Sequence, residues 1–549
     1  MRKAQLYFHT LRYLKPVQLW GRVTFRLLRP KLDLRPAPAV RRSSRAWQTP
    51  AARRVSMLSP TCFHFLNLEH EIPAPADWNS LQLPKLWLYN LHYFDDLNAE
   101  GTASRAEWHR DLIARWIAEN PPGQGTGWEP YPLSLRIINW IKWALAGNTL
   151  NEVARHSLAV QVRFLTQRLE RHLLGNHLFA NAKALVFAGC YFGGDEADAW
   201  LRLGMGILNR EIPEQILADG GHFERSTMYH ALAYEDMLDL LNLVHADPSA
   251  LSPWQSTVAS WPEIIGKMGG WLHAMSHPDG EIAFFNDAAI GIAPSPSALF
   301  AYATRLGLSA VFVPDDVVHL APSGYIRVSL GPAALLIDAA PIGPDYLPGH
   351  AHADTLSYEL SLFGQRVVVN SGTSRYGLGL EREWERSTAA HSTVEVDGQD
   401  SSEVWAGFRV ARRAYPFDIS VTRDGDTVMV EAAHSGYRHL PGRVVHRRRW
   451  IVHATRLEVL DIIEGEFAEA VSRIYFHPDL HITTVSASGM KHPEAGMAQW
   501  QGHRLDWQSE AATVAVKPSS WAPEFGLKLD NVNLELTASK GKVVFALSW

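Results

Sequence analysis

Apolar residues recur with two different periods along this chain, and the period changes near residue 320. From about 80 to 310 they repeat every three to four residues, as expected for amphipathic helices. After Ser104, which has capping-box spacing to Glu107, Trp108 and Leu112 fall on one such face. Short connections between such segments predict helical hairpins. Further helices are expected at 133–147, 152–173, 177–190, 197–210, 228–246 and 254–276.

Beyond residue 320 apolar and polar residues alternate, which is typical of half-buried β-strands. Leu356, Tyr358 and Leu360, for instance, alternate with Ser357 and Glu359. Further strands are expected at 325–330, 333–338, 365–370, 393–397, 428–433, 444–452, 457–463, 471–477, 512–517 and 542–548. Because no helices separate these strands, they predict antiparallel sheets stacked as a sandwich.

The fold class is therefore α+β, and the pattern divides the chain into three parts. We expect an N-terminal helix and linker at 1–55, a helical domain at 56–315 and an antiparallel β-sandwich domain at 316–549. Segment 4–29 indicates one amphipathic helix with a basic face, packed on the body; attachment to a membrane surface is the alternative. Ligand sites favour the crevice between two such bodies.

Composition narrows the functional classes. The chain has 549 residues, 46% hydrophobic and 20% charged, which excludes wholesale disorder. A net charge of −5 gives no basic field for nucleic acid, and no apolar run is long enough for an integral membrane segment. Two cysteines exclude a disulfide framework. Since no signal peptide is recognisable, a cytoplasmic location is the default expectation, with export left open.

Two predicted helix entrances concentrate polar side chains. Asn176 and His177 open one helix, where a helix cap with a hydrogen-bonded core histidine is the simpler interpretation. The other entrance, 219–230, is dense in reactive groups, as binding loops often are. Its candidates are His222, Glu224, Arg225 and Tyr229.

A third cluster, His350, His352 and Asp354, lies just before a predicted strand. In extended backbone alternate residues share a face, so these side chains are expected to point the same way, as for metal binding or proton transfer. Asn370 and His391 stand at two strand ends and could close a metal site with His352. Ordinary strand-edge polarity is the alternative.

A fourth group, Trp128, Glu129 and Arg136, could line a sugar groove, although Trp140 and Trp143, which follow Arg136 at helical spacing, fit a core equally well. A tyrosine with several histidines and asparagines suits proton abstraction, for example β-elimination on a uronic acid. Donors such as an Asn amide or a His must then neutralise the carboxylate. A base removes the C5 proton, and an acid protonates the departing O4.

In these stretches the sequence resembles the heparinase II/III family of polysaccharide lyases. The matching segments are spread along most of the chain in the family's order. They are Trp87–Asp95, Gly127–Pro132, Gly175–His177, Met228–His230, Gly349–Asp354 and Asn370–Thr373. The resemblance implies an incomplete (α/α) toroid followed by antiparallel β-sheets in a sandwich, in agreement with the change of period.

The resemblance also implies roles for the catalytic candidates. Asn176 and His177 would neutralise the uronate carboxylate. Tyr229 would serve as base and acid for one C5 epimer, and His350 would carry the proton for the other.

A divalent metal ion, zinc or manganese, is implied as well and would be structural. His352 and His391 would be two of its ligands. The third ligand in the family is usually aspartate, and Asn370 stands at that position. An amide lacks the carboxylate's charge, so weaker binding is expected.

Three functions stay open. The first is eliminative cleavage of an acidic polysaccharide, either glycosaminoglycan-like or a bacterial uronate polymer. The second is hydrolysis, which needs two carboxylates across a cleft. The third is a non-catalytic accessory protein of surface-polysaccharide metabolism. Carboxylate candidates for hydrolysis are Glu129, Glu224, Asp279 and Asp287.

Overall fold

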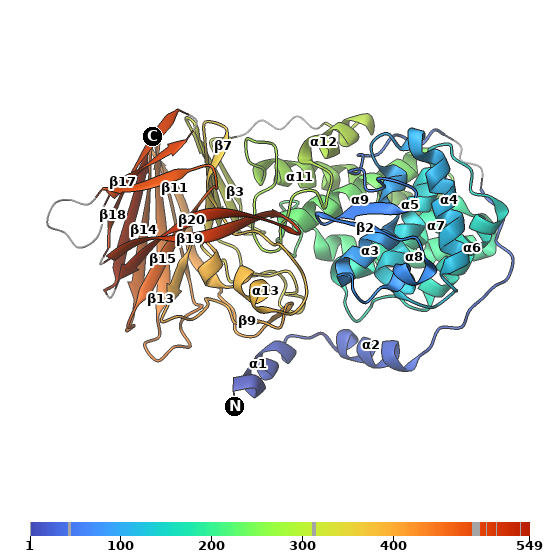
Figure 1. Cartoon of the computed structure of the whole chain (residues 1–549), viewed down its shortest axis with the longest axis horizontal. Coiled ribbons are helices and arrows are strands. Elements are labelled where there is room, and N and C mark those ends of the chain that lie inside the picture. The colour runs from blue at the N-terminus through green and yellow to red at the C-terminus, as the bar shows by residue number, and fades with distance from the viewer. Residues whose placement is uncertain are drawn as a thin grey trace.

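The chain folds into a helical body and a β-body that lie side by side, with two N-terminal helices along one edge (Figure 1). The computed structural model describes residues 2–41, 45–309, 315–485, 495–500, 502–511, 513–538 and 540–549. Residue 512, the first of a predicted strand, lies outside the described residues. Both the α+β class and the order of the two bodies agree with the prediction.

The helical body consists of helices paired in hairpins. Its centre is α7, which is buried at every position from Leu178 to Tyr191 because neighbouring helices surround it. The helices are α3 (Lys85–Tyr93), α4 (Ala106–Glu119), α5 (Pro130–Leu145), α6 (Glu152–Thr166), α7 (Gly175–Tyr191), α8 (Asp195–Gln215), α9 (Thr227–Ala246), α10 (Gln255–Val258), α11 (Trp261–Ala274) and α12 (Pro296–Arg305). A small hairpin, β1 (Cys62–Phe65) and β2 (Leu68–Glu71), lies beside α3. Together they form an incomplete (α/α) toroid.

Two local predictions in this body are wrong. The capping box does not form, because α4 begins at Ala106 and the Ser104 hydroxyl donates to the Gly101 carbonyl instead. The single helix expected at 254–276 is divided into α10 and α11, and Pro262 stands in the first turn of α11.

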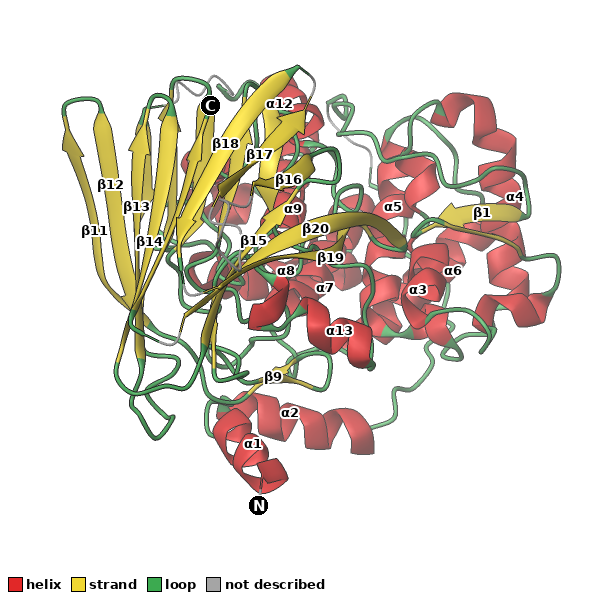
Figure 2. Ribbon diagram, turned by 60° about the vertical axis from the view of Figure 1, so that its left-hand side comes forward, coloured by secondary structure: helices red, strands yellow, loops and turns green. Residues whose placement is uncertain are grey.

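The β-body is a sandwich of two antiparallel sheets (Figure 2). The larger sheet has the order β19-β20-β15-β7-β6-β5-β4-β3, with β8 also paired to β15. It contains β3 (Val317–Leu320), β4 (Tyr325–Leu330), β5 (Ala333–Asp338), β6 (Tyr358–Leu362), β7 (Gln365–Val369), β8 (Val394–Val396), β15 (Ala470–Phe476), β19 (Thr513–Glu524) and β20 (Leu527–Ala538).

The other sheet has the order β11-β12-β13-β14-β21-β18-β17-β16. Its strands are β11 (Pro416–Asp424), β12 (Thr427–His434), β13 (Val445–His453), β14 (Arg456–Glu464), β16 (His481–Val485), β17 (Ala495–Trp500), β18 (His503–Glu510) and β21 (Lys542–Ser548). Along β13 and β14 buried and half-buried positions alternate, because only one face of this sheet meets the core.

Strands β5 and β6 are buried at every position, unlike the strands of the outer sheet. One face packs on the second sheet, and the other faces the helical body. Trp271 of α11 packs against Tyr325 and Leu336 across this boundary. The two bodies therefore share a hydrophobic interface. Short elements complete the region beside it: α13 (Leu380–Glu385), β9 (Val404–Trp405) and β10 (Arg409–Val410).

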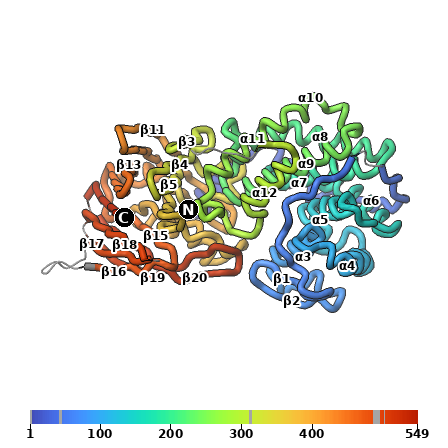
Figure 3. Tube along the Cα trace, turned by 90° about the horizontal axis from the view of Figure 1, so that it is seen from above, coloured from blue at the N-terminus to red at the C-terminus, as the bar shows by residue number. Residues whose placement is uncertain are grey.

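The N-terminal segment is two helices, α1 (Arg2–Leu11) and α2 (Pro16–Leu27), so the single helix predicted at 4–29 is wrong. Pro16 starts α2, and Lys15 before it is extended, as a residue preceding proline prefers. The following strap runs across the helical body (Figure 3). Within it, Arg53 pairs with Glu235 of α9. None of the helices in the described ranges has the length and apolar character needed to cross a membrane.

Candidate active site

Side chains from both bodies meet beside their shared interface. Helix α9 begins at Thr227 and presents Tyr229 in its first turn, while the loop before β6 presents His350. The two rings lie 3.9 Å apart, centroid to centroid. Ser226 caps α9 by accepting from the Tyr229 N–H, and its own hydroxyl donates to the Asp287 carbonyl. The cap therefore ties the tyrosine's helix to the neighbouring loop.

Glu224 connects this pair to the start of α7. Its Oε1 accepts from the Asn176 N–H at 3.4 Å, and its Oε2 lies 3.6 Å from His350 Nε2. A Cβ at Gly175 would lie 2.7 Å from Glu224 Oε1, so only glycine allows this approach. Burial raises the pKa of Glu224, and His350 opposes that shift.

Asp287 is the anchor of the site. Its carboxylate accepts from both His350 Nδ1, at 2.9 Å, and His352 Nε2, at 2.8 Å. Arg382 of α13 binds both of its oxygens. Burial opposes ionisation, but the Arg382 guanidinium and the two histidines hold the pKa of Asp287 well below its usual range. His350 is consequently oriented by a permanently ionised carboxylate.

Tyr229 is kept as a neutral phenol. Burial and the neighbouring Tyr376 and Tyr131 raise its pKa well above the usual value. The hydroxyls of Tyr229 and Tyr376 lie 3.1 Å apart and share a hydrogen bond. A phenol in this state suits proton donation.

His177 lies on the other side of the site, and its side chain is 31% exposed. Its Nδ1 lies 3.0 Å from Glu170 Oε1, and its ring packs on Tyr131 at 4.5 Å. Burial lowers the pKa of His177, but the Glu170 carboxylate outweighs it and the net shift is upward. This favours the imidazolium, a suitable partner for an anionic sugar.

For three residues the predicted role in substrate binding is wrong, because their side chains are buried. Trp128 packs in the core against Trp116. Arg136 is fully buried and donates to Gln161 and to backbone carbonyls. His222 is also buried, with Nε2 3.3 Å from Gln215, and burial lowers its pKa to about 3. None of these side chains is accessible to a substrate.

Of the other three predicted substrate-binding residues, Glu224 lies beside His350, and Arg225 and Glu129 differ from each other. The Arg225 guanidinium donates a hydrogen bond to the Ser323 carbonyl and so holds the loop that contains Ser323. Glu129 is 40% exposed, pairs with Lys85 and accepts from the Tyr89 hydroxyl. Glu129 therefore stays accessible at the edge of the site.

The predicted metal ligands are brought only partly together. His352 Nδ1 and His391 Nε2 lie 3.2 Å apart. The Asn370 amide is engaged elsewhere, since its oxygen accepts from the Ser392 N–H and its nitrogen donates to the Phe284 carbonyl. Within the described ranges no three His, Cys, Asp or Glu side chains are grouped to hold a metal ion. Of the three predicted ligands only the two histidines approach each other, and a metal ion here stays a prediction.

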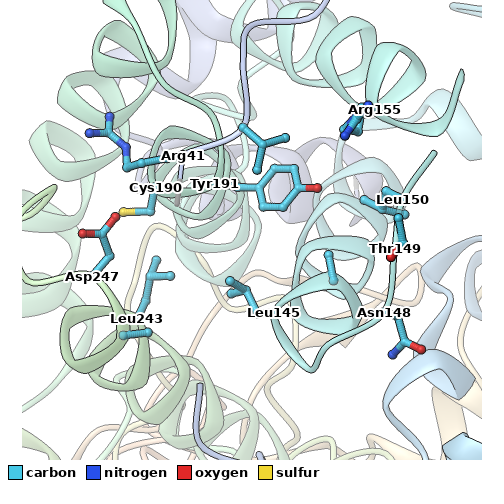
Figure 4. A pocket seen from close by; sticks show the side chains of 13 residues that line it. Arg41, Leu145, Asn148, Thr149, Leu150, Arg155, Cys190, Tyr191, Leu243 and Asp247 are labelled. Carbon is cyan, nitrogen blue, oxygen red and sulfur yellow. The ribbon is translucent and has the colours of Figure 1, made fainter. Parts of the chain in front are cut away.

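A cavity of about 680 Å³ adjoins the site and shares Tyr376 with it. Its walls are mainly apolar and include Leu66, Leu86, Phe408 and Phe525. Another cavity, of about 280 Å³, lies at the far end of α7 and is lined by Arg41, Cys190, Tyr191 and Asp247 (Figure 4). The first cavity meets the site through Tyr376, whereas the second has no residue in common with the site, so the first is the better candidate for substrate.

From sequence Asp287 is only one of several carboxylate candidates, and neither Glu170 nor Tyr376 is predicted. Asp287 follows the apolar run 282–285 and the polar Asn286, without a motif of its own. The one signal in the sequence is the polar pair Asn286 and Asp287 directly after apolar residues. Tyr376 stands just beyond the matching segment that begins at Asn370, and that proximity could have drawn attention to it.

The fold places the chain among proteins with a toroid followed by a β-sandwich. A crystal structure of heparinase III has a TM-score of 0.71 and 17% identity, covering 97% of this chain and 89% of that one. A second heparinase III structure has a TM-score of 0.61 and 18% identity, covering 87% and 81%. At these identities the likeness shows the fold alone.

Family models identify the chain more closely. Residues 109–299 match the heparinase II/III N-terminus, and 313–549 match the heparinase II/III-like C-terminal model. The chain belongs to the heparinase II/III-like family, as the resemblance in its motifs predicted.

Curated relatives include a heparin-sulfate lyase of Pedobacter heparinus, 26% identical over 41% of this chain and 36% of that protein. FtsZ-localized protein C of Caulobacter vibrioides is 26% identical over 69% of this chain and 64% of its own length. The chain thus spans between about a third and two thirds of the length of these relatives.

Proposed function

We propose that this chain is a polysaccharide lyase that cleaves a uronate-containing acidic polysaccharide by β-elimination. Family membership and the heparin-sulfate lyases among its relatives support the reaction class. The observation that carries the proposal is the contact between Tyr229 and His350, with Glu224 and the start of α7 beside them. Two proton-carrying groups at one point are what an elimination requires.

The substrate carboxylate is neutralised first. In the proposal Asn176 donates its side-chain amide and His177 its imidazolium, which Glu170 favours. Neutralisation lowers the cost of placing further negative charge on the enolate that forms when C5 loses its proton. A protonated Glu224, favoured by its burial, adds a third donor.

Proton transfer follows. With Asp287 ionised, the Nδ1–H of His350 donates a hydrogen bond to that carboxylate. The lone pair on Nε2 is then free to act as the base. Nε2 takes the C5 proton, a double bond forms between C4 and C5, and the C4–O4 bond breaks. Tyr229, protonated at neutral pH, gives its proton to O4. For the other C5 epimer the family resemblance gives both transfers to Tyr229, which then needs cationic neighbours in the complex to lower its raised pKa before it can act as the base.

The experiment is an absorbance assay against a panel of uronate polymers, beginning with heparin and heparan sulfate because relatives carry those names. Elimination produces an unsaturated, ultraviolet-absorbing product. Tyr229→Phe is expected to abolish the absorbance rise. Tyr358→Phe is the matched control, because this buried phenol lies in the sandwich core. New reducing ends without absorbance would instead indicate hydrolysis.

A divalent zinc or manganese ion remains part of the proposal as a structural element. His352 and His391 would hold it, with Asn370 as the weak third ligand. Elemental analysis of the purified protein and of His391→Ala tests this. Stoichiometric metal that is lost in the variant supports the site, and metal-free protein with unchanged unfolding removes it from the proposal.

A second candidate function is non-catalytic. FtsZ-localized protein C matches a larger share of this chain than the heparin-sulfate lyases do, 69% against 41%. This favours a localisation role at the division machinery as the alternative. Co-sedimentation with FtsZ polymers, unchanged in Tyr229→Phe and without turnover of any polysaccharide, would decide for it.

A further inference from the structure

Helix α2 is held to the protein by only one of its sides. Gln18 donates to the Tyr346 carbonyl, and Phe25 packs on His172 with ring centroids 4.3 Å apart. Between these two residues, Gly21 packs closely against His172. A Cβ added at Gly21 would lie 3.0 Å from the Cβ of His172. These positions follow at three- and four-residue spacing, so they define one stripe of the helix.

The opposite side of α2 is apolar and faces solvent. Its exposed side chains are Leu19 (50%), Trp20 (70%), Val23 (48%) and Leu27 (75%). With 3.6 residues per turn, these positions cluster on the side opposite the body-facing stripe. In an ordinary surface helix the outward side is polar. Burial in the protein thus cannot explain this apolar face.

Helix α1 repeats the arrangement. Thr10 faces the protein, where its hydroxyl donates to the Val410 carbonyl and accepts from Trp405. Phe8 and Leu11, three residues apart, are 64% and 47% exposed. We call the exposed apolar side chains that point away from the body-facing stripes of both helices the N-terminal apolar face; its members are Phe8, Leu11, Leu19, Trp20, Val23 and Leu27.

Charge distinguishes this segment from the rest of the chain. The chain carries a net charge of −5, yet residues 1–32 contain eight Lys and Arg and no Asp or Glu. Arg22, Arg26 and Arg29 form no ion pair with the residues that the structure describes. Lys15 is paired with Glu214. A strongly basic segment on an acidic protein points to an anionic partner.

We propose that the N-terminal apolar face docks on the surface of an anionic lipid bilayer as a peripheral anchor. An apolar face beside a row of arginines is the composition of interfacial amphipathic helices. Trp20 suits the headgroup level, and the arginines attract anionic headgroups. A protein partner would satisfy the apolar face, but it gives no reason for a segment free of acidic residues.

Docking would also place the candidate active site near the lipid surface. Helix α1 contacts β10, and α2 contacts Tyr346, in the loop that leads to His350. Figures 1 and 2 show α1 beside β9 at the edge of the molecule. An anchored chain would therefore work on polymer close to a membrane. The docking itself does not depend on the proposed lyase activity.

Vesicle co-sedimentation of the full chain tests the proposal. We expect binding to vesicles of phosphatidylglycerol and phosphatidylcholine, weakening as salt is raised, and little binding to pure phosphatidylcholine. Trp20→Glu with Leu27→Glu should reduce binding at least tenfold, and Arg22→Glu with Arg26→Glu should remove the preference for anionic lipid. Leu81→Glu is the matched control, since Leu81 is fully exposed on the helical body and should leave binding unchanged.

Three outcomes would overturn the docking. They are no binding of the wild-type chain, equal binding of the Trp20 and Leu27 variant, and a stable dimer that this variant abolishes. Because the substituted side chains are exposed, the thermal unfolding temperature of each variant should match that of the wild type. Matching temperatures show that a loss of binding is not a loss of fold.

Discussion

Asp287 in the candidate site and Asp461 inside the β-sandwich are buried carboxylates with closely similar partners. Each binds an arginine through both oxygens, Arg382 in one case and Arg448 in the other. Each also accepts from a histidine 2.8 Å away. Burial opposes ionisation at both, yet the arginine and histidine lower the pKa of each carboxylate.

The similarity extends to a second histidine. His352 Nδ1 lies 3.2 Å from His391 Nε2, and His446 Nδ1 lies 3.2 Å from His434 Nε2. The second pair lies wholly inside the sandwich. A close histidine pair in this protein is therefore a feature of buried networks, and it does not by itself indicate a metal ion.

What separates the two clusters is access. Around Asp461 every partner is buried, including His434, His446 and Arg448. Around Asp287 one additional partner, His350, is 15% exposed and stacks on a tyrosine. Around Asp461, where no partner is exposed, the network has a structural role only. It becomes chemically useful where one histidine reaches the surface beside a second proton carrier.

The largest expected effect tests that difference. His350→Ala should lower kcat by about 10²- to 10⁴-fold, the range for a general acid or base, while the protein stays folded. His446→Ala, its counterpart in the closed cluster, should lower stability and leave the kcat of the folded fraction unchanged. Steady-state kinetics with circular dichroism on both variants checks this. Equal losses of kcat would remove the distinction between the clusters.

Replacing the carboxylates should affect stability in both places. Asp287→Asn and Asp461→Asn each leave a buried arginine unpaired, so each should cost about 3–5 kcal/mol in the free energy of unfolding. Both folded-state pKa values lie below the unfolded value near 3.9, so this stability is present at neutral pH. It is lost as pH falls below about 4.

Urea titrations at pH 7 and pH 3 measure the two losses. Each variant should lie closest to the wild type at the lower pH. A loss that persists unchanged at pH 3 would mean that the ionised carboxylate is not its source.

Glu224 should respond in the opposite direction. Burial raises its pKa, so its stabilising contribution is complete below the unfolded value near 4.3 and declines as pH rises. Glu224→Gln should therefore stabilise the protein at pH 7 by about 1–2 kcal/mol, comparable to the cost of an unsatisfied buried polar atom. Chemical denaturation at pH 7 and pH 4 measures the gain, which should vanish at the lower pH. Glu107→Gln, on an exposed side chain, is the neutral control.

The smallest effect is expected at Tyr376. Tyr376→Phe removes one hydrogen bond to the Tyr229 hydroxyl, worth about 0.5–1 kcal/mol. If Tyr376 positions the phenol, kcat should fall about two- to fivefold with KM unchanged. A change in KM alone would assign Tyr376 to substrate binding through the adjoining cavity.

Much of the fold could be predicted because it depends on local pattern. The strands at 325–330 and 333–338 have the predicted bounds, since alternation and flanking turns determine both. Periodicity finds the faces of a helix but not what each face meets. Trp128 was therefore assigned to a groove although it lies in the core, and the break before Pro16 was missed.

The candidate site was accessible from sequence only where reactive residues cluster. His350 and His352 stand two positions apart, and both reach one carboxylate, although their segment is a loop and not a strand. That carboxylate, Asp287, lies more than sixty residues earlier in the chain, and Arg382 lies about a hundred residues after it. Such pairings arise from the packing of the two bodies, and no spacing along the chain encodes them.

Strands β5 and β6, buried on both sides, limit how the protein can move. Hinge opening would strip the helical body from the sheet. It would hydrate the apolar contact of Trp271 with Tyr325 and Leu336 and break the buried hydrogen bonds of His277 to Glu359 and Ser361, which is costly. We therefore expect the cavity beside the candidate site to keep nearly the same width with and without polymer. A long glycan would enter by sliding in from the side, and chain length beyond the cavity would change affinity little.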